Sequence, residues 1–232
     1  EWFCDGMAEE VINTLSQIES IRVAARKSAF YFKGKETDLR EIGEKLSVET
    51  VLEGSIRKAG NRLRVTAQLI NVVDGYHLWS RQYDRDMEEI FEVQSDVARN
   101  IAEALKDKLT LTEKQQIEQR PTQNVEAYTL YIRGRDYILK SHEKTDLLFA
   151  EKMLRKAIQL DSNFAYAYAW LSGVYINLYW FYYDRTSERL TMAKEFVDKA
   201  LQLDPQLHLA YGVLGMYYFQ IPDFYAAQQA CE

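Results

Sequence analysis

Few cysteines, few prolines and no long hydrophobic run set the first limits on this chain of 232 residues. Its two cysteines, Cys4 and Cys231, stand near opposite ends, so a disulfide framework is excluded. Pro occurs only 3 times and 47% of the residues are hydrophobic, which indicates a folded chain. The longest apolar run, Val174 to Tyr183, contains Asn177 and is far shorter than the roughly 20 apolar residues that span a bilayer. We therefore expect no membrane insertion.

Motifs that hold phosphates, metals or catalytic nucleophiles are also absent from the sequence. The 10 glycines form neither G-x-G-x-x-G nor G-x-x-x-x-G-K, and there is no G-x-S-x-G elbow. No HExxH or CxxC occurs, and His77, His142 and His208 are far apart in the chain. Asp84 and Asp86 are carboxylates at a strand exit before an acidic helix start. We expect no enzyme activity, no cofactor and no metal in this chain.

No strong excess of positive charge is present either. The net charge is −6, with 18 basic and 22 acidic residues up to residue 123, and 11 and 13 after it. Neither half is expected to bind polyanions by bulk charge. One stretch, residues 21–35, has five cations and no acid, and a following hairpin adds more. An anion patch is one interpretation and a solvated sheet face is the other. The candidate patch residues are Arg57, Arg62 and Arg64.

The first half has a mixed helix and strand pattern. Apolar residues at helical spacing predict a helix over 5–18 with Asp5 as its cap, and a short helix after the cap Asp38. Alternating residues predict an antiparallel three-stranded meander. The expected strands are 51–58, 62–71 and 76–83, a β-leaning stretch covers 21–32, and a long helix covers 87–109.

The composition changes near residue 123. Residues 110–123 are polar and contain Pro121, and 13 of the 16 tyrosines lie beyond them. The pattern after this point is helical throughout. We therefore predict an α+β chain with two domains: an α/β domain over 1–109, a linker over 110–123 and an all-α domain over 124–232.

The second half repeats one register. Tyr168-x-x-Leu171-Ser172-x-x-Tyr175 matches Tyr211-x-x-Leu214-Gly215-x-x-Tyr218, and a degraded version precedes both. This resembles the tetratricopeptide pattern of helix pairs, with about two and a half repeats and the last one cut short. Relative to the usual 34-residue unit, about four extra residues precede Ala150 and about nine precede Ala193. The second insertion would include the aromatic run 179–183, unless the first helix of that pair is extended. We expect the chain to be a piece of a longer protein with further repeats.

Tetratricopeptide arrays bind partners on a concave surface formed by the first helix of each pair. The register predicts an apolar, aromatic groove with one cation, suited to a protein or peptide and lacking a clamp for carboxylates. The alternative is that these aromatic side chains pack between helices. The predicted groove residues are Tyr128, Tyr131, Arg135, Tyr166, Ala169, Gly173, Leu209, Gly212 and Met216.

The first half resembles a known bacterial domain. The ordered segments Phe3-Cys-Asp-Gly-Met7, Arg22-Val-Ala-Ala-Arg26, Val51-Leu-Glu-Gly-Ser55 and Gly75-Tyr-His-Leu-Trp-Ser80 are similar to the TolB-like amino-terminal α/β domain of multidomain regulators. In that family a strand precedes the Asp-Gly helix, so we expect the first strand to be missing here. The resemblance implies an output domain elsewhere: a class III adenylate cyclase, a winged-helix transcription regulator or a Ser/Thr kinase.

Three functions follow from these patterns. The first is a non-catalytic regulatory segment of a bacterial signalling protein, whose repeats bind a partner. The second is an oligomerisation module that pairs output domains. The third, a nucleic-acid or anion contact through the basic sheet face, has less support because base-stacking aromatics are not evident there. Both a cytoplasmic and a periplasmic location stay open.

Overall fold

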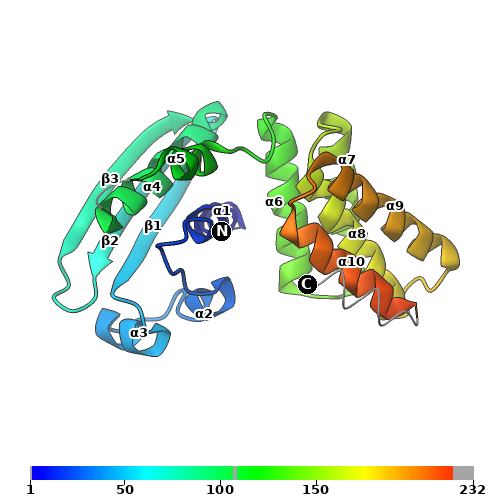
Figure 1. Ribbon diagram of the computed structural model, residues 1–232, viewed down its shortest axis with the longest axis horizontal. Coiled ribbons are helices and arrows are strands. Elements are labelled where there is room, and N and C mark those ends of the chain that lie inside the picture. The colour runs from blue at the N-terminus through cyan, green and yellow to red at the C-terminus, as the bar shows by residue number, and fades with distance from the viewer. Residues whose placement is uncertain (1, 107–108, 222–232) are drawn as a thin grey trace. The chain divides into compact units, whose positions relative to one another are not determined.

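The computed structural model describes residues 2–106 and 109–221 and contains two compact units. One unit runs from Phe3 to Arg120 and the other begins at Pro121. An antiparallel three-stranded sheet lies in the first unit, and the second is helical within the described residues (Figure 1). The expected α+β composition of the chain is therefore confirmed.

The first unit has helices before and after a continuous meander. Its elements are α1 (Trp2–Ser16), α2 (Arg26–Phe30), α3 (Leu39–Leu46), β1 (Thr50–Ala59), β2 (Arg62–Asn71), β3 (His77–Asp86), the 3-10 helix η1 (Met87–Glu89), α4 (Ile90–Leu105) and α5 (Leu111–Glu118). The Asp38 side chain accepts a hydrogen bond from the Arg40 amide at 2.8 Å, so the predicted cap of α3 is confirmed.

The sheet has the order β1-β2-β3, with β2 in the centre. Residues 63, 65, 67 and 69 of β2 are buried, while Arg62 and Arg64 on the opposite face are exposed. This alternation follows from the two-residue period of a strand with one face on the core. The inner face packs against α4, whose buried residues include Ile90, Val97 and Ile101. In Figure 1, α4 and α5 lie over the sheet, whereas α3 lies beyond the lower end of β1.

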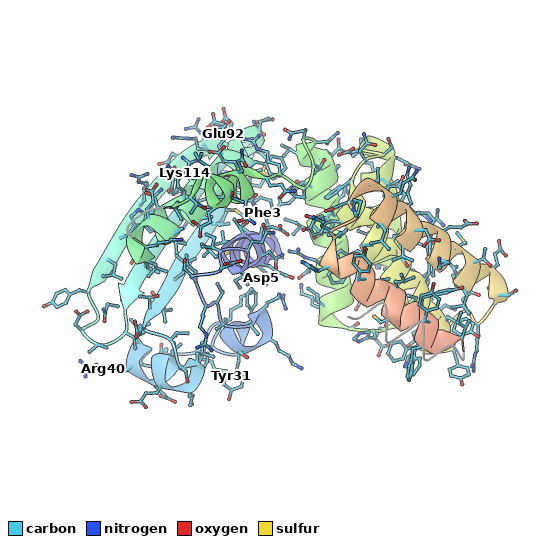
Figure 2. The ribbon with its side chains drawn as sticks, viewed as in Figure 1. Phe3, Asp5, Tyr31, Arg40, Glu92 and Lys114 are labelled. Carbon is cyan, nitrogen blue, oxygen red and sulfur yellow. The ribbon has the colours of Figure 1, made fainter. Side chains whose placement is uncertain are left out.

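Two predictions for the beginning of the chain are wrong. Residues 21–32 contain α2 instead of a strand: the amides of Ser28 and Ala29 both bond to the Ala25 carbonyl oxygen. A strand needs a neighbour to receive its backbone hydrogen bonds, and no described strand pairs with this stretch. Asp5 is not a cap either, because α1 begins at Trp2. Its carboxylate accepts a hydrogen bond from the Lys33 ammonium at 2.7 Å instead. Figure 2 labels Asp5 on α1.

The stretch predicted as a linker, 110–123, contains α5. This helix begins with a reciprocal capping box, in which Thr110 accepts from the Glu113 amide and the Glu113 side chain accepts from the Thr110 amide. Two ion pairs hold α5 to the end of α4, from Arg99 to Glu118 at 3.0 Å and from Lys106 to Glu113 at 2.7 Å. The polar composition of the stretch reflects an exposed helix.

The second unit consists of paired helices. They are α6 (Val125–Lys140), α7 (Lys144–Leu160), α8 (Ala165–Trp180), α9 (Ser187–Leu203) and α10 (His208–Gln220). α6 packs on α7 and α8 on α9, and α8 also contacts α7 and α10. Only three residues separate α6 from α7, so longer helices absorb the extra residues there. The second helix expected in the third pair falls on residues 222–232, outside the described residues.

Small residues allow these helices to approach closely. The alanines at positions 150, 157, 193 and 200 are fully buried. At Gly134 on α6, an added Cβ would lie 3.0 Å from Leu154 Cγ and 3.3 Å from the Ala150 carbonyl oxygen of α7. A larger side chain would therefore push the two helices apart, which explains why these registers favour Gly and Ala.

Candidate interaction surfaces

The predicted groove residues on α6 are buried. Asn124 caps this helix by accepting from the Ala127 amide at 2.9 Å. Tyr128 is fully buried, Tyr131 is 1% exposed, and Arg135 is 2% exposed. The Arg135 guanidinium donates to the Tyr131 hydroxyl at 3.0 Å, and the Tyr131 ring lies 4.9 Å from that of Phe164. The aromatic side chains predicted for the groove on α6 therefore pack inside the helical unit, as the alternative interpretation expected.

The predicted groove residues on α8 and α10 differ in exposure, and the exposed ones lie on α10. Ala169 and Gly173 of α8 are buried, whereas Tyr166 and Leu209 are half-buried. Gly212 is exposed, and a Cβ added there would meet no described atom within 4 Å. Met216 is 45% exposed. The accessible part of the predicted groove is thus on α10.

An aromatic cluster extends this accessible part. The rings of Trp180, at the end of α8, and Phe219, near the end of α10, have centroids 5.8 Å apart. Trp180 is 49% exposed and Phe219 is 54% exposed. The ends of both helices lie at the same end of the unit (Figure 1). Together with Met216, these side chains form an apolar surface that a partner could cover.

A charged network that no sequence pattern predicted joins α7, α8 and α9. Glu151 of α7 accepts from Arg155 Nε at 3.0 Å and from Arg189 Nη1 of α9 at 3.4 Å. Arg189 Nε also pairs with Asp184 at 2.7 Å. The buried Tyr175 ring of α8 lies 5.1 Å from the Arg189 guanidinium, and burial raises the pKa of its hydroxyl. We define these five residues as the charged network.

The electrostatics of the charged network favour its ionised state. The hydrogen bond from Arg189 lowers the pKa of Asp184, and Asp184 and Glu151 in turn hold the Arg189 pKa high against the effect of burial. Side-chain exposure is only 15% for Glu151 and 18% for Arg189. Partial burial strengthens the attraction between the two charges and also adds a desolvation cost, so removal of one partner should destabilise the fold more than at an exposed pair.

The three arginines proposed as an anion patch lie on the outer face of the sheet. Arg57 is directly opposite Arg64 in the register of β1 and β2. Arg64 Nε pairs with Asp84 of β3 at 2.7 Å, and Arg62 Nη1 lies 3.4 Å from Asp86. Carboxylates of β3 therefore balance two of the three cations, which reduces the charge available to a polyanion.

A polar cavity of about 520 Å³ lies between β3, α4 and α5. Its charged lining is balanced, with three arginines and three carboxylates. The Tyr83 hydroxyl at this cavity is buried, and burial, followed by the neighbouring Asp96, raises its pKa to about 12. The lining residues are Tyr83, Arg85, Glu92, Val93, Ser95, Asp96, Arg99, Glu118 and Arg120.

The described ranges 2–106 and 109–221 contain no group of three or more His, Cys, Asp or Glu side chains placed to hold a metal ion. None of their helices has both the length and the apolar character needed to cross a membrane.

Comparison with known proteins gives one informative relative. No protein-family model matches the chain. The chain is 42% identical over 171 residues to a protein of Rhizobium meliloti (strain 1021) named "Putative adenylate cyclase 3". The match covers 74% of this chain and 29% of the relative, so the chain spans less than a third of that protein's length.

Proposed function

We propose that this chain is a non-catalytic regulatory segment of a bacterial signalling protein of the adenylate cyclase type. The similarity to a cyclase-named protein, confined to 29% of that protein, is the observation that carries the proposal. A segment that matches part of a larger protein and has no recognisable catalytic motif fits a regulatory role better than a catalytic one. The chemistry would then be performed by another part of the parent protein.

The two units have different roles in this proposal. Helices α6 to α10 would form a tetratricopeptide-type solenoid that binds a protein or peptide partner. The close helix contacts at Gly134, together with the fully buried alanines, support such stacked pairs. The first unit, with its meander and flanking helices, would be a TolB-like domain over 1–109. The order of the two units agrees with the regulators that the sequence resembles.

The partner surface is proposed to be the accessible apolar area of α8 and α10. It contains Gly212, Met216 and Phe219, with Trp180 at its edge. Exposed aromatic and methionine side chains are enriched in protein interfaces. A partner would cover these residues, whereas the buried tyrosines of α6 would make no contact with it.

The test uses the complete signalling protein and measures both partner capture and cyclic AMP output. Met216→Asp places a charge on the proposed surface, and Gly212→Trp adds a bulky side chain at a position where a Cβ would meet no described atom within 4 Å. Leu148→Asp on α7 is the matched control, because Leu148 is 44% exposed and Met216 is 45% exposed. We expect the first two variants to reduce capture at least tenfold and to change the cyclic AMP output, unlike the control. Normal capture and output in both variants would contradict the proposal.

A further inference from the structure

We propose that the polar cavity between β3, α4 and α5 binds a free amino acid, through one side chain that recognises its carboxylate and one that recognises its ammonium. The cavity measures about 520 Å³, which is within the range of about 300–1,000 Å³ usual for small-molecule sites. All of its lining residues belong to the first compact unit, and none of them lies on α1 or β1. The site is therefore independent of partner binding by the helical unit.

The Tyr83 hydroxyl at this cavity is a buried polar group without a partner. Tyr83 is 5% exposed, and no described residue forms a hydrogen bond with its hydroxyl oxygen. The neighbouring Asp96 carboxylate accepts a hydrogen bond from Arg81 at 3.2 Å instead. Burial, followed by Asp96, raises the pKa of the Tyr83 hydroxyl to about 12, so at neutral pH this group stays protonated and can donate to a ligand. Because buried polar groups normally have a partner, this position favours a bound polar molecule.

Most of the charged side chains around the cavity already have partners. Arg99 of α4 donates to Glu118 of α5 at 3.0 Å and lies 3.9 Å from Asp96. Arg85 of β3 pairs with Glu89 at 3.2 Å. These residues hold the walls of the cavity together and are not the ones expected to bind a ligand.

Two opposite charges at the cavity have no ion pair among the described residues. They are Arg120, which follows α5, and Glu92 in the first turn of α4, which Figure 2 labels. The Arg120 guanidinium lies 5.6 Å from the centre of the Phe91 ring, a cation–π contact that positions it. The hydroxyl of the half-buried Ser95 on α4 has no hydrogen bond among the described residues either. In the described part of the chain, the groups without a partner at this cavity are therefore one cation, one carboxylate and two hydroxyls.

An amino acid complements these groups better than a simple anion or a simple amine does. A guanidinium binds a carboxylate through two parallel hydrogen bonds, and a carboxylate accepts from an ammonium. A ligand with only a carboxylate would leave Glu92 unpaired, and a ligand with only an ammonium would leave Arg120 unpaired. The Tyr83 and Ser95 hydroxyls can form hydrogen bonds with the remaining polar atoms of the ligand.

NMR titration of the full 232-residue chain with each standard L-amino acid tests the ligand class. At least one amino acid should bind with a Kd of about 1 mM or below. Its decarboxylated amine and its deaminated acid should each bind at least about tenfold more weakly, because each loses one charged contact. Failure of every amino acid to bind at about 10 mM would overturn the proposal. Inorganic phosphate that binds as tightly as the best amino acid would also overturn it, since the site would then recognise a simple anion.

Removal of single charges tests the two charged residues. Arg120→Gln and Glu92→Gln should each raise the Kd of the best amino acid at least about tenfold. Arg120→Gln should leave the Kd of the amine unchanged, and Glu92→Gln should leave that of the acid unchanged. The matched controls are Arg57→Gln and Glu53→Gln, because both residues are exposed on β1 and have no ion pair among the described residues. Loss of affinity in the controls, or unchanged affinity in the two test variants, would contradict the assignment.

Tyr83→Phe separates ligand binding from fold stability, because it removes only the hydroxyl. Since no described residue satisfies this hydroxyl, its removal should leave the Tm measured without amino acid unchanged or raise it. The Kd of the best amino acid should rise about three- to tenfold. A lower Tm with an unchanged Kd would mean that the hydroxyl has only a structural role, and this result would overturn its assignment to the site. Partner capture by the helical unit is measured separately, so a failure here is distinguishable from a failure of the proposed function.

Discussion

Glu151→Gln should weaken the interaction between the helix pair α6–α7 and the pair α8–α9. Glu151 contacts Arg155 of its own helix at 3.0 Å and Arg189 of α9 at 3.4 Å, and the Gln side chain keeps the shape but removes the charge. Hydrogen bonds to charged groups contribute about 1.5–3 kcal/mol. The contact to Arg189 is long, and Arg189 keeps its 2.7 Å pair with Asp184, so the lower end applies. We expect a loss of about 1.5–2 kcal/mol in the free energy of unfolding of the helical unit.

The measurement is urea unfolding combined with hydrogen exchange resolved to individual helices. With a slope of about 1–3 kcal/mol per molar urea, the midpoint should fall by roughly 1 M. Glu195→Gln is the control, because Glu195 is exposed on α9 and has no ion pair among the described residues. A double-mutant cycle of Glu151→Gln with Arg189→Met measures the coupling itself. A coupling energy below about 0.3 kcal/mol would refute the argument, because it would be no larger than the error of additivity.

Two other changes probe the same unit. Leu154→Ala removes a fully buried side chain next to Gly134 and should lower the free energy of unfolding by about 2–5 kcal/mol, measured by thermal or chemical unfolding. Leu160→Ala is the control, because Leu160 is 36% exposed and its loss should lower the free energy of unfolding far less. Similar losses in both variants would contradict the packing described. Asp184→Asn should flatten the acid dependence of stability, because the hydrogen bond from Arg189 lowers the folded-state pKa of Asp184 below its ordinary value of 3.8. The wild type then has this stability above the unfolded-state pKa and loses it as pH falls through the lower folded value. Parallel stability curves of wild type and variant between about pH 5 and 2 would contradict this assignment.

The meander could be predicted because its information is local. In β2, Leu63 and Val65 alternate with Arg62 and Arg64, and the Gly60–Asn61 turn fixes the register with β1. The strand prediction for residues 21–32 was wrong because a strand forms only beside a hydrogen-bonding neighbour, and no described strand provides one. Local sequence therefore determines a hairpin more reliably than an isolated strand.

The candidate surfaces were predictable only in part. Helical periodicity placed Met216 and Gly212 on one face of α10, where both are exposed. The same periodicity gave no signal that Tyr128 is fully buried, because burial depends on what packs against a helix. Glu151 and Arg189 are 38 residues apart, and their contact follows from the packing of α7, α8 and α9. A single sequence contains no local pattern for such a long-range ion pair.

The connectivity of both units has a kinetic consequence. β1 pairs with β2 and β2 with β3, while α6 pairs with α7 and α8 with α9, so the main contacts join neighbours in the chain. Such short loops cost little entropy to close, and proteins rich in local contacts fold fast for their size. Each hairpin or helix pair can therefore form soon after its second element leaves the ribosome. Synthesis from the amino terminus would then assemble the meander before the helix pairs, without waiting for the rest of the polypeptide.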